Sequence, residues 1–364
     1  MNFNRVVIKV GSALISPDGK GCSGKYIQHI ARFISECHKK NKEVILVSSG
    51  SVAAGRHLIQ HRSIKPSIQT KQAMASVGQI QMMANWQKYI DVPCSQLLIT
   101  HGDLKARDRY INIRNTLRVL LANKIIPIVN ENDTVATEEL KVGDNDNLAA
   151  LVALVAEADT LLLVSDINGV YNKDPKIHHD AKILFDIPEI TDEIHAMAGT
   201  THNAIATGGM KTKIEAAEKA VDNGIDTYIV NGTNSQVFDD LLAGIKTGTH
   251  FFANKELSKA KKYWLKHTLK SNGSILIDNG AVNALKNTGA SLLPSGILVI
   301  NGQFLAGDSV DIVDEKEQVI AKGICQYNYQ DLGRIKGKRT EDIQNILGFC
   351  LSKVIVHRDD MVVL

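Results

Sequence analysis

Two lysines in different parts of the chain have surroundings that suit chemistry on a phosphate. Lys9 lies inside the apolar run 5–10 and precedes a Gly-Ser pair. A lysine within a buried strand is unfavourable unless it is paired or faces a ligand. Lys213 ends the segment 207–213, TGGMKTK, in which a glycine pair opens a predicted helix. Free N–H groups and lysines at a helix start favour a polyphosphate. The alternatives are a strand-edge lysine that faces water and a flexible loop with exposed lysines.

The longest polar segment surrounds the end of one predicted strand and the start of the next predicted helix. It reads NENDTVA over 130–136 and KVGDNDN over 141–147. A helix cap would account for one of its residues and leave Asn130, Asp133 and Asp146 without a structural role. This concentration of amides and carboxylates therefore indicates a functional site.

Two other strand ends carry polar residues with a less specific signal. The segment 47–51, VSSGS, runs into a predicted helix whose free N–H groups would suit a carboxylate. Taken alone, it is better explained by an ordinary serine cap. The segment 164–175 begins with a strand end in Ser-Asp and continues into a turn. An adenine or ribose fits there, and a plain turn fits its composition equally well.

The elements that must position these residues alternate between short apolar runs and longer amphipathic stretches. The runs predicted as strands are 5–10, 43–49, 94–100, 124–130, 160–165 and 226–230. The stretches predicted as helices are 25–42, 70–89, 107–123, 145–158 and 210–223. This alternation predicts an α/β fold, a three-layer αβα sandwich around a mostly parallel sheet. Ligands bind beyond the carboxyl ends of the strands in such sheets, where the polar segments lie.

A change of sequence style divides the chain into two predicted domains. Residues 1–252 carry the strand–helix alternation and are predicted to be the catalytic domain. A Lys-rich linker is predicted over 253–267. Closely spaced strands with glycine turns over 268–364 predict a small β-rich, barrel-like domain.

Composition predicts a soluble cytoplasmic protein with reduced thiols. The five cysteines form no CxxC pair, which argues against a disulfide framework or a zinc site. No apolar stretch approaches the roughly 18 residues of a membrane span, and the first residues do not read as a signal peptide. The net charge of +3 gives no reason to expect nucleic acid or an anionic membrane as the main partner.

Taken together, the motifs resemble the amino acid kinase family over nearly the whole chain. IKVGS, VSSGSVAAGR, NENDTVAT, KVGDNDNLAA and ATGGMKTK follow one another in the family's order. The NEND and GDND blocks resemble the members that act on glutamate. The C-terminal part, from ILIDNGAVNAL through SLLPSGI to IVHRDD, resembles a PUA domain. Val10 stands where leucine is usual and Ser165 where threonine is common, and neither departure removes a functional group.

The resemblance implies a reaction and a set of site residues. ATP with Mg²⁺ would phosphorylate the γ-carboxylate of L-glutamate to L-glutamyl 5-phosphate, the first step of proline biosynthesis. Lys9 and Lys213 would contact the ATP phosphates and stabilise the phosphoryl group in transfer, and Asp146 would hold both lysines. Glutamate would be bound by Ser49, Asp133 and Asn145. The nucleotide would be lined by Lys9, Ser165, Asp166, Thr207, Gly208, Gly209, Met210, Lys211, Thr212 and Lys213.

The physical chemistry of this reaction agrees with the residues present. A carboxylate with a pKa of about 4.3 is already ionised at neutral pH, so the nucleophile needs no general base. The motifs of the predicted catalytic domain contain no His or Cys. The reaction requires alignment and cations against the crowding of two anions. Mg²⁺ is expected mainly on the ATP phosphates, with no protein ligand assigned.

The nearest alternative is another member of the same family, acting on N-acetylglutamate, aspartate, carbamate or UMP. Asp133 discriminates among these substrates. A buried carboxylate near the substrate suits a free α-ammonium and would repel an acylated amine or a nucleotide phosphate.

A different alternative is an RNA-binding protein, because some PUA domains bind RNA. From residue 268 onward there are 10 Lys+Arg and 11 Asp+Glu, a net charge of 10 − 11 = −1, whereas RNA-binding modules carry a basic excess. We therefore expect small-molecule partners, L-glutamate and ATP, with no membrane and no nucleic acid. The resemblance also implies a homo-oligomer and functional coupling to a reductase that consumes glutamyl phosphate.

Overall fold

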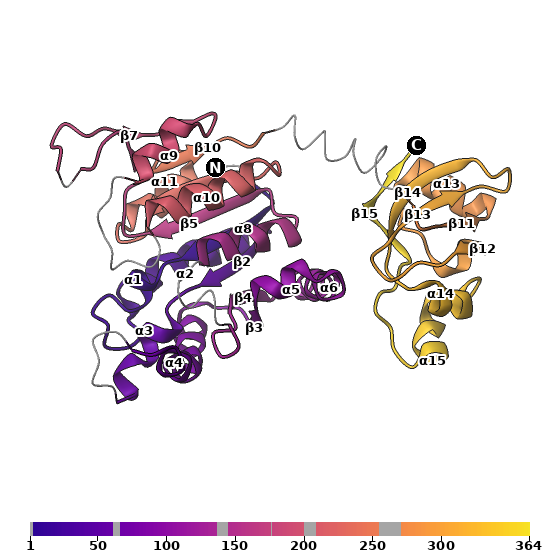
Figure 1. Ribbon diagram of the computed structural model, residues 1–364, viewed down its shortest axis with the longest axis horizontal. Coiled ribbons are helices and arrows are strands. Elements are labelled where there is room, and N and C mark those ends of the chain that lie inside the picture. The colour runs from indigo at the N-terminus through magenta and orange to yellow at the C-terminus, as the bar shows by residue number, and fades with distance from the viewer. Residues whose placement is uncertain (1–2, 61–65, 137–144, 176, 200–208, 255–270) are drawn as a thin grey trace. The chain divides into compact units, whose positions relative to one another are not determined.

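The computed structural model describes residues 3–60, 66–136, 145–175, 177–199, 209–254 and 271–364. The chain divides into two compact units, which are drawn in Figure 1. The first unit comprises 1–105 and 116–255, and the second comprises 106–115 and 256–364. No helix among these described residues is long and apolar enough to cross a membrane.

A large sheet forms the centre of the first unit. Among the described residues its order is β3-β4-β2-β1-β5-β9-β10-β8. The strands are β1 Arg5–Val10, β2 Glu43–Ser48, β3 Cys94–Ile99, β4 Ile126–Glu131, β5 Thr160–Ser165, β8 Asp186–Ile187, β9 Asp226–Asn231 and β10 Thr249–Phe251. Every pairing from β3 to β9 is parallel, whereas β10 runs antiparallel to β9. A separate hairpin pairs β6 Val170–Tyr171 with β7 Ile183–Leu184.

Helices cover both faces of this sheet. They are α1 Ser12–Ile15, α2 Gly24–Lys39, α3 Ser51–Gly55, η1 Arg56–Leu58, α4 Ile68–Tyr89, α5 His101–Lys105, α8 Asn145–Val155, α9 Asp192–Gly199, α10 Met210–Val221 and α11 Gln236–Ala243. Helix α6 Arg107–Ala122 is divided between the two units after residue 115. Apolar side chains of α2, α4 and α11 form one core with alternate residues of the strands. On the other face α8 packs against β1 and β5, and α10 packs against α8 and β9 (Figure 1). The predicted three-layer α/β fold is confirmed.

The two-residue period of β1 determines where its lysine points. Val6, Ile8 and Val10 belong to the core beneath α2. Lys9 therefore lies on the opposite face, toward α8 and α10, because successive side chains of a strand alternate between faces.

The second unit has its own sheet and its own core. The strands are β11 Gly273–Ile277, β12 Ile297–Gly302, β13 Ser309–Val313, β14 Val319–Cys325 and β15 Val356–Val363, in the order β12-β11-β13-β14-β15. The shorter elements are α13 Asn279–Thr288, η2 Pro294–Gly296, α14 Tyr329–Ile335, η3 Thr340–Asp342 and α15 Ile343–Leu347. Fully buried side chains such as Tyr327, Ile312 and Leu332 form its core. This unit has the β-rich character predicted for 268–364, and most of the predicted linker, 253–267, lies outside the described residues.

Candidate active site

The carboxyl ends of four neighbouring parallel strands bring the predicted site residues to one edge of the sheet. Ser49 follows β2, Asp133 follows β4, and Ser165 ends β5. Lys9 is the last residue but one of β1. Helices α8 and α10 begin at the same edge, since Asp146 and Lys213 near their first residues lie beside Lys9.

A buried carboxylate lies between the two predicted catalytic lysines. Lys9 Nζ is 2.6 Å from Asp146 Oδ1, and Lys213 Nζ is 3.0 Å from Asp146 Oδ2. All three residues are at most 5% exposed. Thr212 Oγ1 lies 2.8 Å from Asp146 Oδ2 and 2.9 Å from the carbonyl oxygen of Gly209, so its hydroxyl donates to one of them at a time. Residues 9, 146 and 213 are thus brought together from three separate segments.

The charges of this cluster keep Asp146 ionised. Burial alone would raise the pKa of Asp146, but the adjacent Lys9 and Lys213 ammonium groups outweigh it and hold that pKa well below its ordinary value. Asp146 also lies in the first turn of α8, where the helix dipole favours a negative charge. Two ammonium groups and one carboxylate carry 2 − 1 = +1 together, which suits a polyphosphate.

A chain of side-chain amides lies beside the strand ends of β2 and β4. Asn145 Nδ2 donates to Ser49 Oγ at 2.9 Å and to Asn130 Oδ1 at 3.0 Å. Asn130 Nδ2 donates to Gln79 Oε1 at 2.8 Å. Two predicted glutamate-binding residues, Ser49 and Asn145, are therefore in direct contact. Asn130, which had no assigned role, connects them to α4.

The third predicted glutamate-binding residue is joined to the start of α3. Ser51 Oγ donates to Asp133 Oδ2 at 2.6 Å. Burial raises the pKa of Asp133 above its ordinary value, and the Ser51 hydrogen bond opposes that rise. Gly50 makes the turn into α3 with φ of 104°, a backbone conformation that favours glycine.

The predicted nucleotide-binding residues are placed less uniformly. Ser165 is buried and its hydroxyl donates to Asp166 Oδ1 at 3.1 Å, whereas Asp166 itself is exposed. Gly209 precedes α10 and Met210 begins it. The side chain of Lys211 is 74% exposed and lies 3.9 Å from Glu215, away from Asp146. Thr207 and Gly208 lie outside the described residues.

Besides Asn130, three residues of this region had no predicted role. Ser51 was within a quoted motif but was explained as part of a cap. Glu131, only 5% exposed, has its Oε2 3.3 Å from His101 Nδ1 and lies inside the NEND block. Gln79 sits in the middle of a long helix, and no local pattern distinguishes it from the other glutamines of α4.

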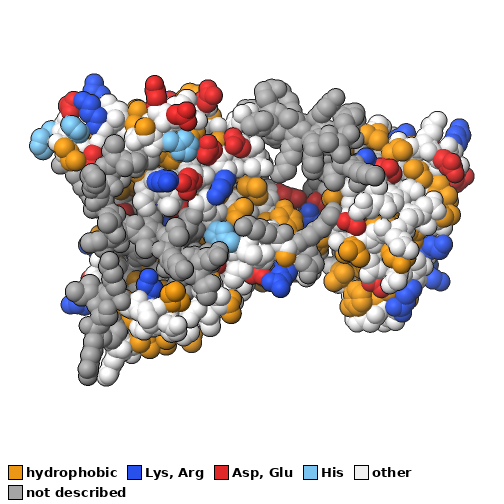
Figure 2. All heavy atoms as spheres, in the orientation of Figure 1, with side chains coloured by type: hydrophobic (Ala, Val, Ile, Leu, Met, Phe, Trp, Pro, Cys, Tyr) orange, Lys and Arg blue, Asp and Glu red, His pale blue; other side chains and the backbone are white. Residues whose placement is uncertain are grey.

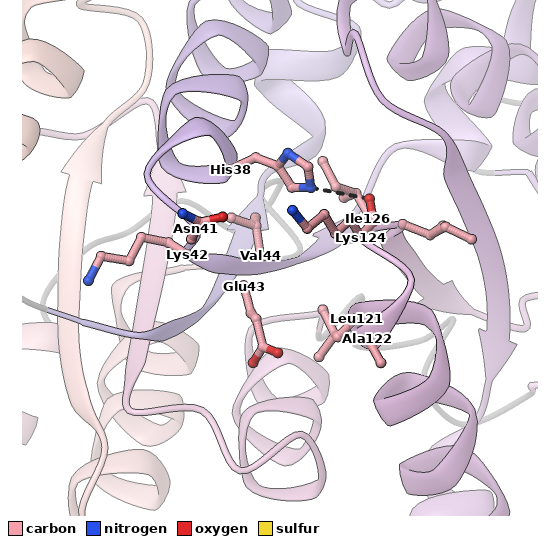
Figure 3. A pocket seen from close by; sticks show the side chains of 10 residues that line it. His38, Asn41, Lys42, Glu43, Val44, Leu121, Ala122, Lys124 and Ile126 are labelled. Carbon is pink, nitrogen blue, oxygen red and sulfur yellow. Dashed lines mark hydrogen bonds between the residues drawn. The ribbon is translucent and has the colours of Figure 1, made fainter.

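A cavity at the opposite edge of the sheet contains none of these residues. It is lined by the amino-terminal residues of β2 and β4 and by the end of α6, as Figure 3 shows. In that view His38 points to the carbonyl oxygen of Lys124, 3.2 Å away. The chemistry-bearing residues therefore gather at the carboxyl edge.

The comparisons with known proteins agree with the motifs. The profile of the amino acid kinase family matches residues 4–231, and the PUA domain profile matches 273–347. A glutamate 5-kinase of Idiomarina loihiensis is 49% identical over all of this chain and 98% of its own length. The glutamate 5-kinase of Salinibacter ruber is 50% identical with the same coverage. That of Xanthomonas euvesicatoria is 44% identical over 98% of this chain and its full length.

Proposed function

Because this chain belongs to the amino acid kinase family and is about half identical to glutamate 5-kinases over its full length, we propose that it phosphorylates L-glutamate with ATP. A γ-carboxylate oxygen of glutamate attacks the γ-phosphorus of ATP, the bond to the bridging oxygen breaks, and ADP leaves. The product is L-glutamyl 5-phosphate, in the first step of proline biosynthesis. The substrate is already ionised near neutral pH, so no side chain has to remove a proton.

The observation that carries this proposal is the buried group Lys9–Asp146–Lys213 beside the amide chain of Ser49 and Asn145. The two lysines would neutralise the transferring phosphoryl group, where charge stabilisation matters most. Asp146 would orient both of them. Ser49, Asp133 and Asn145 would bind glutamate. Ser165, Asp166 and the 207–213 segment would bind the nucleotide.

The side chains of the proposed site are consistent with a Mg²⁺ ion that is bound mainly by the phosphate oxygens of ATP. The Asp146 carboxylate is engaged by two lysines, so it is poorly suited to bind a metal. Within the described ranges, no three His, Cys, Asp or Glu side chains converge as a metal site. This donor set supports an ion held mainly by phosphates, where it would neutralise their charge.

The same proposal assigns separate roles to the two domains of the chain. We assign catalysis to residues 1–252 and a separate PUA domain to 268–364, joined by 253–267. On the face drawn in Figure 2, the second unit shows both acidic and basic side chains, and basic ones gather at its lower right. The net charge of −1 from residue 268 onward gives no support to RNA binding as the main function. A homo-oligomer, coupling to a reductase and a cytoplasmic location stay predictions.

One assay tests the proposed reaction. The purified protein is incubated with ATP, Mg²⁺ and hydroxylamine, which traps an acyl phosphate as a hydroxamate. Product should form with glutamate, and much less should form with N-acetylglutamate or aspartate. Preference for N-acetylglutamate or aspartate would assign the chain a different substrate within its family.

A further inference from the structure

The amide chain that reaches Asn145 ends on a residue that no motif contains. Gln79 lies in the middle of α4 and is 7% exposed. Its Oε1 accepts a hydrogen bond from Asn130 Nδ2 at 2.8 Å. Its Nε2 has no hydrogen-bond partner among the described residues, although the atom is buried. An unsatisfied buried donor is unfavourable, so this glutamine is not explained by fold stability alone.

The hydrogen bonds of this chain run in one direction. Asn145 uses both hydrogens of its amide nitrogen, one toward Ser49 Oγ and one toward Asn130 Oδ1. Asn130 can accept that bond only if its own Nδ2 faces Gln79, where an oxygen receives it. The acceptor at residue 79 therefore determines which way each amide of the chain points.

This direction determines what the site offers to a ligand. With both amide hydrogens of Asn145 engaged, its Oδ1 is left as an acceptor, which suits an ammonium group. Ser49 Oγ accepts from Asn145, so its own hydrogen is left to donate to a carboxylate. An amino acid carries both of these groups on its α-carbon.

We propose that Gln79 is a positioning residue that orients Asn130 and Asn145 so that the site recognises the α-amino acid end of its substrate. The inference rests on the proposed function and adds a residue to it. Gln79 is well placed for this because α4 is held firmly. Trp86 Nε1 donates to Ser48 Oγ at the end of β2, 2.9 Å away, and Gly78 lies against the backbone of α3.

The test separates the acceptor at residue 79 from the packing of α4. Gln79→Met removes the acceptor oxygen, and Gln79→Asn moves it back by the length of one methylene. Gln81→Met is the matched control, because Gln81 lies on the same helix and makes no side-chain hydrogen bond among the described contacts. KM for glutamate, KM for ATP and kcat are measured for each folded variant.

Gln79→Met and Gln79→Asn should raise KM for glutamate by about 2- to 12-fold, the value of one hydrogen bond. KM for ATP and kcat should change little, and Gln81→Met should stay close to wild type. If Gln79→Met does not fold, Gln79→Asn carries the same comparison. In an Asn130→Ala background, Gln79→Met should have no further effect, because Gln79 acts through Asn130.

Three results would overturn the inference. They are an unchanged glutamate KM in both Gln79→Met and Gln79→Asn, an equal rise in Gln81→Met, or a parallel rise in the KM for ATP. If the wild type forms hydroxamate with glutamate and any of these results is found, the proposed reaction stands and only the positioning role of Gln79 is rejected. A wild type that forms no hydroxamate with glutamate would overturn the proposed function and this inference together.

Discussion

At the scale of single residues, the site depends on one carboxylate that serves two cations. Asp146 is 1% exposed and contacts both lysines, so the three charges are shielded from water together. Losing one member of a buried ion pair leaves an uncompensated charge, which is far more destabilising than losing an exposed pair. The exposed pair of Arg32 and Asp239, at 2.7 Å, offers the comparison within the same unit.

Asp146→Asn should lower stability by about 3–5 kcal/mol, whereas Asp239→Asn should cost at most about 1 kcal/mol. The pKa of Asp146 is lower in the folded state than in the unfolded chain. Its ionised carboxylate therefore contributes fully to the free energy of unfolding at pH values above the unfolded-state pKa. That contribution is lost only as the pH falls below the unfolded-state pKa. The stability gap between wild type and Asp146→Asn should therefore be constant from about pH 8 to pH 5 and narrow only below about pH 4. Urea unfolding across this range measures the gap. A gap that already narrows between pH 8 and pH 5 would show that Asp146 is not held ionised.

Asp133 is expected to bind the α-ammonium group of glutamate through its carboxylate. Asp133→Asn keeps the shape and removes the charge, and a charge-assisted hydrogen bond is worth roughly 1.5–3 kcal/mol. The kcat/KM for glutamate should therefore fall by about 10- to 150-fold. Glutarate, which lacks the amine, serves as the matched substrate, and discrimination against it should narrow in the variant. An unchanged preference for glutamate over glutarate would exclude Asp133 as the group that reads the amine.

At the scale of elements, the short helix α3 and the long helix α4 cross so closely that only glycine fits at their contact. A Cβ atom on Gly78 of α4 would lie 1.9 Å from the carbonyl oxygen of Ser51 and 2.5 Å from the nitrogen of Gly55. Both contacts are with the backbone of α3, which cannot move aside without carrying Ser51 with it. Since Ser51 holds Asp133, the crossing of α3 and α4 supports the glutamate-binding residues.

Gly78→Ala should destabilise the protein by about 1–3 kcal/mol through overpacking and should also raise KM for glutamate. Gly333 of α14 is the control position, because a Cβ atom there would meet nothing within 4 Å. Gly333→Ala should be neutral or slightly stabilising, by about 0.5–1 kcal/mol. Thermal unfolding and glutamate KM are compared for the two variants. Equal behaviour of the two would mean that α3 moves freely against α4.

At the scale of the whole molecule, the proposed catalytic residues all precede residue 214 and belong to the first unit. The second unit contains its own apolar core and, within it, a pair of Arg114 Nη1 and Asp360 Oδ1 at 2.5 Å. The first half of α6 thus belongs to the second unit, which no pattern in the sequence indicates.

A chain that ends near residue 252 should still form glutamyl phosphate from glutamate and ATP. The reason is that no proposed site residue lies in the removed part. Hydroxamate formation measures activity, and circular dichroism shows whether the helices, α6 included, remain folded. A truncated protein that is folded but inactive would mean that the PUA domain contributes to the site or its assembly.

The sequence by itself determined the elements and the kind of chemistry, because both depend on neighbouring residues. Continuous apolar runs and amphipathic stretches of helical period placed β1, β5 and α10 to within a few residues. The motif order indicated the family. Lys9 could be recognised as unusual because it interrupts a buried strand.

Only the tertiary structure decided which of these residues meet. Asp146 contacts lysines 137 and 67 positions away, since 146 − 9 = 137 and 213 − 146 = 67, and such contacts depend on strand order and helix packing. Gln79 carries no local signal, because a glutamine inside a helix is usually solvated. Its contact with Asn130 of β4 joins two segments far apart in the chain, and the direction of the amide chain follows from that contact. Long-range packing therefore converts separate polar segments into one site.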